Sequence, residues 1–263
     1  MANENPTIVV TRPAPDHAAL LEALAARGLA AAHSPAFRIA PAEAGALDAA
    51  LEGLQRFDRI VVTSPAAARI LADRVGRPGR PGPGLVAPGR GTAAILEAAG
   101  LDVVHPENGG TSEHVLALPE LQRVAGLTIA IVGAPGGRDA IRRELADRGA
   151  DVRRLQIYRR VPMPPAAALV EALEARCPLI VLISSLKAFE ELTAALKPEL
   201  REAWLGAQFI VSSQRLASAC RAAGATGIRC AAGAGNHDML DALDRALRET
   251  ANSGGLDDLG PGN

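Results

Sequence analysis

Aromatic residues are nearly absent from this chain of 263 residues, which has four Phe, one Trp and one Tyr, or 2% of the total. Base stacking on nucleic acid, aromatic cages for cations and interfaces anchored by Tyr and Trp all need more rings than this. Hydrophobic residues still make up 48% of the chain, so Ala, Leu, Val and Ile must build the core. At about 100–200 residues per domain, the length predicts two domains.

Several other features are also missing. The 28 basic and 29 acidic residues leave a net charge of −1 without a long run of one sign, which argues against a nucleic-acid partner. The longest stretch free of charged residues, Val124 to Gly137, is shorter than the roughly 20 residues of a membrane-spanning helix. No signal peptide is visible, the three cysteines lack metal-binding spacing, and no two histidines are four apart. We therefore expect a cytoplasmic chain without a metal site or membrane contact.

Short apolar runs alternate with amphipathic runs along almost the whole chain. The runs typical of strands are Thr7–Thr11, Arg59–Thr63, Gly84–Ala87, Asp102–His105, Leu127–Val132, Pro178–Ser184, Gln208–Ser212 and Thr226–Cys230. The runs typical of helices include His17–Arg27, Ala66–Val75, Thr92–Ala99, Asp139–Arg148, Ala166–Arg176, Lys187–Leu196, Arg215–Ala223 and Asp238–Arg248. This alternation predicts an α/β protein with parallel sheets covered on both faces.

An internal repeat is the most informative feature of the sequence. The segment 8–28, IVVTRPAPDHAALLEALAARG, resembles 129–149, IAIVGAPGGRDAIRRELADRG, at a shift of 121 residues. Two further matches are Phe37-Arg38 with Tyr158-Arg159, also at 121, and RIVVTSPAAARIL from Arg59 with LIVLISSLKAFEEL from Leu179, at 120. The period is too long for a solenoid, so the repeat predicts two similar lobes.

Two extended, proline-bounded segments occupy matching places in the repeat: HSPAFRIAP from His33 and RRLQIYRRVPMP from Arg153. They could pair as a two-stranded ladder that joins the lobes, in which case one lobe is discontinuous. They could equally be ordinary edges of the two sheets, because proline is tolerated on edge strands. The pattern of residues leaves both interpretations open.

Two glycine-containing turns lie between a strand and a helix. GRGTAA at Gly89–Ala94 fits a dinucleotide-binding pattern, with Glu107 near the spacing of a ribose-binding acid, but it also fits a tight turn after Pro88. GAPGGR at Gly133–Arg138 lacks the Lys-Ser/Thr of a P-loop. Backbone N–H groups at such a turn, together with Arg138, could bind a carboxylate or a phosphate.

Hydroxyl residues recur where a strand or loop meets the next helix: Thr63-Ser64, Thr92, Thr111-Ser112, Ser184-Ser185 and Ser212-Ser213. Serine and threonine are common N-caps, which explains the pattern without any ligand. The carboxyl ends of parallel strands are also where α/β proteins bind their ligands. If two lobes face each other, these groups would line one cleft suited to a polyanion.

In their order along the chain, five motifs resemble the uroporphyrinogen-III synthase family. They are VTRP at Val10–Pro13, DRIVVTSPAAA at Asp58–Ala68, PGRGTAAIL at Pro88–Leu96, GGRDAIRRELADRGADVRRLQIYRR at Gly136–Arg160 and FIVSSQRLASACRAAG at Phe209–Gly224. The resemblance implies two similar doubly wound parallel-sheet lobes joined by a two-stranded connector. The implied boundaries are 1–36 plus 164–250 for lobe 1, 41–157 for lobe 2, and 37–40 and 158–163 for the connecting ladder. The composition of the tail, 251–263, predicts disorder.

The resemblance also implies an activity, that of a lyase without a cofactor. The substrate would be hydroxymethylbilane, a linear tetrapyrrole with eight carboxylates, which loses its terminal hydroxyl and closes with ring D inverted through a spiro intermediate. The matching positions make Tyr158 the catalytic residue, since a phenol is protonated at neutral pH and can donate to the departing hydroxyl. The implied substrate-binding residues are Arg12, Ser64, Thr92, Thr111, Ser112, Arg138, Ser184, Ser213 and Gln214.

Two other functions fit parts of the pattern. The chain could be a non-catalytic two-lobed binding module for a polyanionic metabolite, or a nucleotide-dependent oxidoreductase that uses GRGTAA. Formation of the inverted ring from fresh hydroxymethylbilane would separate the lyase from both. We expect a monomer with a small-molecule substrate as its only partner.

Overall fold

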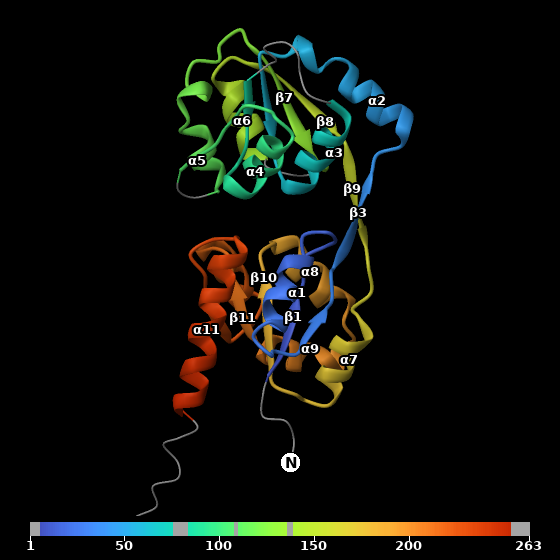
Figure 1. The fold of residues 1–263 in the computed structure, drawn as a ribbon, viewed down its shortest axis with the longest axis vertical. Helices are drawn as coiled ribbons and strands as arrows, with labels where there is room; N and C mark the ends of the chain where they lie inside the picture. Colours follow the sequence, from blue (N-terminus) through green and yellow to red (C-terminus); the bar gives the residue numbers. More distant parts are fainter. Residues whose placement is uncertain (1–5, 76–83, 108–109, 136–138, 254–263) are drawn as a thin grey trace, which may run out of the picture. The chain divides into compact units, whose positions relative to one another are not determined.

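The computed structural model describes residues 6–75, 84–107, 110–135 and 139–253. The chain divides into two compact units: unit 1 comprises Met1–Arg38 and Pro162–Asn263, and unit 2 comprises Ile39–Val161. Each unit contains one five-stranded sheet with helices on both sides (Figure 1), and a two-stranded sheet connects them. The predicted α/β class with two parallel-sheet lobes and a two-stranded connector is confirmed.

Unit 1 is formed from both ends of the chain. Its strands are β1 (Thr7–Val10), β2 (Ala31–His33), β10 (Leu179–Ile183), β11 (Gln208–Val211) and β12 (Gly227–Cys230). Its helices are α1 (Ala18–Ala25), α7 (Ala167–Glu174), α8 (Leu186–Ala195), α9 (Pro198–Gly206), α10 (Gln214–Ala222) and α11 (Asn236–Ser253). All the strand pairs of its sheet, ordered β12-β11-β10-β1-β2, are parallel.

Unit 2 is formed from one continuous segment. Its strands are β4 (Arg59–Val62), β5 (Gly84–Val86), β6 (Val103–Val104), β7 (Thr128–Gly133) and β8 (Asp151–Gln156). Its helices are α2 (Ala44–Glu52), α3 (Pro65–Val75), α4 (Arg90–Ala98), α5 (Ser112–Leu116) and α6 (Asp139–Asp147), with 3₁₀ turns at Leu54–Arg56 and Pro119–Leu121. The sheet order is β6-β5-β4-β7-β8, again parallel throughout.

The two sheets have the same architecture in a permuted chain order. In unit 1 the β1-α1-β2 segment comes first, whereas its repeat, β7-α6-β8, comes last in unit 2. The strand order therefore reverses between β1 and β10 in one sheet and between β7 and β4 in the other. Such a switch point, at the carboxyl ends of the strands, is the usual ligand site of a doubly wound sheet.

The connector consists of β3 (Phe37–Pro41) and β9 (Tyr158–Pro162). Beyond its two ends, Ala42 N donates to Ile157 O at 2.9 Å and Met163 N donates to Ala36 O at 2.9 Å. This pattern is antiparallel. Of the two interpretations that the extended segments allowed, the ladder is the one that the structure has.

Some elements differ from the sequence-based expectation. Strands β2 and β8 were not predicted; β2 has three residues, and β8 is an edge strand whose DVRRLQ carries charges instead of an apolar run. Helix α11 continues to Ser253, so the expectation of a disordered tail from 251 is wrong for 251–253. The remainder of that tail, 254–263, lies outside the described residues.

The repeat register also needs a correction by one residue. Helix α3 begins at Pro65 and α8 at Leu186, a shift of 121 instead of the 120 taken from sequence. The caps agree, because Ser64 Oγ accepts from Ala67 N and Ser185 Oγ accepts from Ala188 N. Ser64 therefore corresponds to Ser185, and the whole first part of the repeat keeps a single shift.

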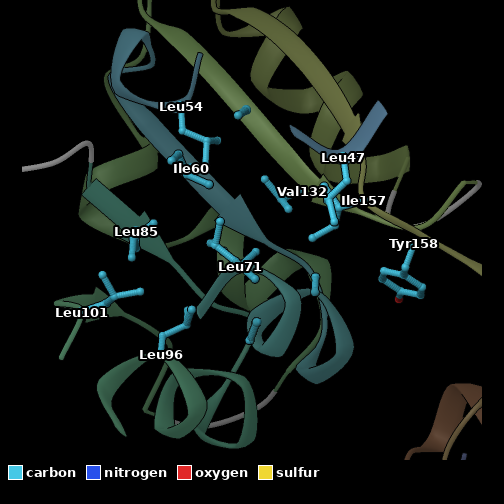
Figure 2. Close-up of a cluster of buried hydrophobic side chains, with 14 residues drawn as sticks. Leu47, Leu54, Ile60, Leu71, Leu85, Leu96, Leu101, Val132, Ile157 and Tyr158 are labelled. Atoms are coloured by element: carbon cyan, nitrogen blue, oxygen red, sulfur yellow. The ribbon is translucent and has the colours of Figure 1, made fainter. Parts of the chain in front are cut away.

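Both faces of the unit 2 sheet are covered by a hydrophobic cluster, and successive strand residues point alternately into one cluster and the other. Ile60 and Val62 face a cluster with Leu71 and Leu96 (Figure 2), whereas Val61 faces the opposite one. In Figure 2 the Tyr158 ring lies at the margin of the first cluster. Burial on both faces explains why these strands read as continuous apolar runs.

Half of the chain's few rings pack together in unit 1. Trp204 and Phe209 meet edge to face at 5.0 Å between ring centroids, and Phe189 lies 5.5 Å from Phe209. The indole N–H of Trp204 donates to Thr193 Oγ1 at 2.8 Å, so its one polar atom is satisfied. The core of unit 1 is thus the one place where the described structure concentrates aromatic packing.

At the switch point of unit 2, two strand ends are packed too closely for a side chain. Thr63, which follows β4, donates its hydroxyl to Val132 O on β7 at 2.9 Å. A Cβ added to the neighbouring Gly133 would lie 2.1 Å from that hydroxyl oxygen. Glycine is therefore required at the end of β7 by the position of the threonine.

We expect Gly133→Ala to lower the free energy of unfolding by about 1–3 kcal/mol, because the methyl group must displace the Thr63 hydroxyl and break its hydrogen bond. Chemical denaturation measures this loss. In a Thr63→Ala background, which removes the obstructing oxygen, the same change should cost less. The control is Gly45→Ala in α2, where the added Cβ meets nothing within 4 Å; equal effects of the two alanines would contradict the close packing.

Candidate active site

The sequence-predicted residues of unit 2 lie along the carboxyl edge of its sheet. Ser64 follows β4, Thr92 lies in the first turn of α4 after β5, and Thr111 and Ser112 begin α5 after β6. Tyr158 follows β8 at the start of the connector. Thr92 is buried, at 4% exposure. Five predicted residues from four strand ends are therefore gathered on one edge.

Two of these residues are in direct contact. The hydroxyl oxygens of Ser64 and Tyr158 lie 2.9 Å apart, although the residues are 94 apart in sequence. Ser64 follows β4 and Tyr158 follows β8, so their bond links the strand ends on either side of β7, one of the two strands at the switch point. The Tyr158 side chain is 3% exposed, and the guanidinium carbon of Arg160 lies 6.0 Å from the centre of its ring.

Some of the predicted hydroxyl residues act as helix caps. In unit 2, Thr111 Oγ1 accepts from His114 N at 3.4 Å, and in unit 1, Ser213 Oγ accepts from Leu216 N at 3.3 Å. Gln214 is the first residue of α10, and Ser184 accepts from the Ser212 hydroxyl through its backbone carbonyl. These residues of unit 1 follow β10 and β11, which are neighbours in the sheet. Capping is thus the role of Thr111 and Ser213 in the described structure, whereas Ser184 and Gln214 lie beside a cap.

Arg12 holds a loop of unit 1 together. One guanidinium nitrogen donates to Asn236 Oδ1 at 2.5 Å and the other donates to the carbonyl of Ala234. Burial lowers the pKa of Arg12, and Asp16 opposes that shift. The guanidinium therefore braces the turn before α11. Arg138 lies outside the described residues, as do Gly136 and Gly137 of its glycine loop.

A pair of stacked histidines lies next to Arg12, and nothing in the sequence indicated it. The rings of His17 and His33 are 3.9 Å apart and within 8° of parallel. His33 Nε2 donates to Arg12 O at 2.7 Å, and His17 Nδ1 is buried without a partner among the described residues. Burial and, secondly, the charge of His33 lower the pKa of His17, whereas Asp16 raises it. The contact joins the N-cap residue of α1 to the last residue of β2. The two histidines are sixteen residues apart in the sequence, so no local pattern could show their contact.

The GRGTAA segment forms an ordinary strand-to-helix turn. Gly89 has an extended backbone and precedes α4, and Gly91 already belongs to the first helical turn. Gly91 also has open space where a Cβ would lie. Packing within the described structure therefore does not require glycine at position 91.

The His17 pair makes stability depend on pH. A lowered pKa means that the unfolded chain binds the proton more readily, so protein stability should fall as the pH decreases below about 6.5. We expect His17→Phe, which keeps a ring against His33 but cannot be protonated, to make this fall shallower. Urea unfolding between about pH 5.5 and 7.5 measures the slope. His237→Gln, at a side chain that is 86% exposed, is the control; identical slopes for wild type and His17→Phe would refute the assignment.

In the part of the chain that the structure describes, no helix is both long enough and apolar enough to span a membrane.

Comparisons with known proteins identify the family. The family model described as "Uroporphyrinogen-III synthase HemD" matches residues 18–241. The uroporphyrinogen-III synthase of Escherichia coli (strain K12) is 32% identical over 245 residues, which cover 90% of this chain and 99% of that protein. That of Salmonella typhimurium is 32% identical over 247 residues, with the same coverage.

Solved structures share the fold. A mutant uroporphyrinogen III synthase from Thermus thermophilus has a TM-score of 0.64 at 21% identity, covering 93% of this chain and 99% of that one. The uroporphyrinogen-III synthetase of Helicobacter pylori has a TM-score of 0.57 at 12% identity, covering 92% and 99%. The chain therefore belongs to the uroporphyrinogen-III synthase family and has its hydro-lyase function in tetrapyrrole biosynthesis.

Proposed function

We propose that this hydro-lyase acts on hydroxymethylbilane and that Tyr158 is its proton donor. The observation that carries the assignment of Tyr158 is its place: the only tyrosine of the chain has its hydroxyl beside the switch point of unit 2, bonded to Ser64. A switch point is the part of a doubly wound sheet where ligands bind. A phenol there can donate a proton as a general acid.

The reaction releases one water molecule and must balance its protons. The bond between the terminal methylene carbon and its hydroxyl oxygen breaks, and the oxygen keeps the electron pair. It leaves as water with the phenol proton of Tyr158, so the bilane becomes an azafulvene cation and the phenol becomes a phenolate. Ring D then attacks through its substituted carbon and forms a spiro intermediate. The bond from that carbon to its original methylene bridge breaks, the bridge bonds to the unsubstituted carbon of ring D, and this carbon loses its hydrogen as a proton. That proton restores the phenol.

The carboxylates of the substrate need many donors, and neutral ones suffice. We assign them to the hydroxyl and backbone N–H groups at the strand ends: Thr92, Thr111 and Ser112 in unit 2, and Ser184, Ser213 and Gln214 in unit 1. Ser64 belongs to the same set. Each lies at or beside the start of a helix, where the partial positive charge of the helix attracts an anion. Arg12 and Arg138 are assigned as cationic contacts of the same substrate.

Two finer expectations stay predictions: a monomeric chain and a cytoplasmic location. Burial raises the pKa of the Cys220 thiol to about 11, which keeps the thiol protonated and slow to react. This suits a chain whose cysteines remain reduced. Light scattering on the purified protein measures the oligomeric state directly.

We expect Tyr158→Phe to lower kcat by about 10²–10⁴-fold, the range typical of a lost general acid. Stability should fall by only about 1 kcal/mol, because one buried hydrogen bond is lost while the ring is retained. Chromatographic separation of the product isomers measures the enzymatic and the spontaneous closure together. The variant should yield more of the isomer in which ring D is not inverted, since the bilane also closes unaided.

The matched control is Thr193→Val, which removes a hydroxyl from unit 1 that bonds Trp204 and the Phe189 carbonyl. It should lose at least as much stability as Tyr158→Phe, because the buried Trp204 N–H is left without its acceptor, and it should keep wild-type turnover. Wild-type turnover of Tyr158→Phe would instead remove the phenol from the chemistry. Absence of inverted product from the wild-type protein would favour the binding-module alternative.

A further inference from the structure

The Ser64–Tyr158 contact has a geometry that suits one particular task. Tyr158 is almost fully buried, and its recorded hydrogen bond joins its hydroxyl oxygen to Ser64 Oγ at 2.9 Å. Figure 2 shows the ring at the margin of the leucine-rich cluster, against which it packs. Since the ring is fixed by packing, the hydrogen bond determines how the hydroxyl proton can point.

Ser64 is itself held from the other side. Its Oγ accepts from Ala67 N at 3.2 Å, and its carbonyl accepts from Ala68 N at 3.0 Å. Ala67 and Ala68 are both fully buried, so the first turn of α3 cannot shift without disturbing the core. The serine oxygen therefore stays within reach of the phenol.

Serine has one proton and two lone pairs, and the Ala67 N–H occupies one lone pair. After the Ala67 contact, the Ser64 hydroxyl retains one proton and one lone pair, so it could donate to the phenol or accept from it. We propose that Ser64 is a positioning residue: its proton is donated to the phenol oxygen of Tyr158, which leaves the phenol proton free for the departing hydroxyl of the substrate. In the reverse direction the phenol proton would be bound to Ser64 and could not be transferred until that bond broke.

The same bond assists the transfer. The phenol oxygen gains negative charge as its proton leaves, and a preorganised donor aimed at that oxygen stabilises the charge. Ser64 sits at the amino end of α3, whose dipole acts in the same sense. The inference rests on the proposed role of Tyr158, and it changes the assignment of Ser64 from substrate binding to positioning.

Ser64→Ala tests the inference through a separation of kinetic constants. A group that acts on Tyr158 in the transition state affects kcat, whereas a group that binds the substrate affects KM. We expect kcat to fall by about tenfold to a hundredfold, as for a lost hydrogen bond to a charged group, with KM nearly unchanged. Ser64→Thr, which retains the hydroxyl, should restore most of the turnover. A raised KM with an unchanged kcat would mean that Ser64 contacts the substrate itself.

A spectroscopic measurement tests the direction of the bond without substrate. The Raman doublet of a phenol ring depends on whether its oxygen accepts or donates a hydrogen bond, and here a single tyrosine produces it. The wild-type intensity ratio should be that of an accepting phenol, and Ser64→Ala should shift it. A donating wild-type phenol, or an unchanged ratio in the variant, would overturn the inference. The wild-type spectrum alone decides the direction if Ser64→Ala does not fold.

Ser185→Ala is the matched control. Ser185 makes the corresponding cap in unit 1, to Ala188 N, so this variant should lose comparable stability and leave the Raman doublet unchanged. Failure of the inference and failure of the proposed function remain distinguishable. Loss of turnover in Tyr158→Phe but not in Ser64→Ala would remove only the role of Ser64, whereas full turnover in Tyr158→Phe would remove the donor role itself.

Discussion

The candidate site depends on one residue, Ile157, which lies between β8 and β9 and whose backbone bonds to the ends of both the unit 2 sheet and the connector. Its N–H donates to Gly133 O at the end of β7 at 3.1 Å, and its carbonyl accepts from Ala42 N beside the connector at 2.9 Å. Its side chain is fully buried. Because Tyr158 is the next residue, the phenol begins where the backbone is fixed from both sides, directly beside the switch point.

Helix capping and ligand binding, which the sequence presents as alternatives, are compatible at these hydroxyl groups. A cap uses a lone pair of the side-chain oxygen to accept a main-chain N–H, and the hydroxyl proton remains available to an outside acceptor. Thr111 and Ser213 cap in this way, whereas the proton of the Ser64 cap is assigned to Tyr158. A substrate rich in carboxylates presents many acceptors, so a row of capped helices can serve it without a cluster of exposed cations.

The central strands and the repeat were predictable because burial on both faces leaves long apolar runs, such as those at β4 and β10. The edge strands β2 and β8 were not predictable, because β2 is only three residues long and the half-exposed β8 carries Asp, Arg and Gln like a loop.

For the site, the sequence was enough to predict which types of residue lie at the strand ends. The contacts were not predictable: the Ser64–Tyr158 bond requires β7 to lie between β4 and β8, and the His17–His33 stack requires β1 and β2 to pair. Local periodicity contains no information on such pairings.

The permuted order of the two units has a consequence for biosynthesis. Strand β1 is fully buried from Ile8 to Val10, yet its partner β10 is about 170 residues further along the chain. At about 5–20 residues per second, the ribosome needs roughly ten to thirty seconds to supply it. During that interval unit 2 can complete its sheet, while β1 has an unpaired hydrophobic edge of the kind that aggregates. The nascent amino-terminal segment therefore exposes this apolar edge until β10 has been synthesised.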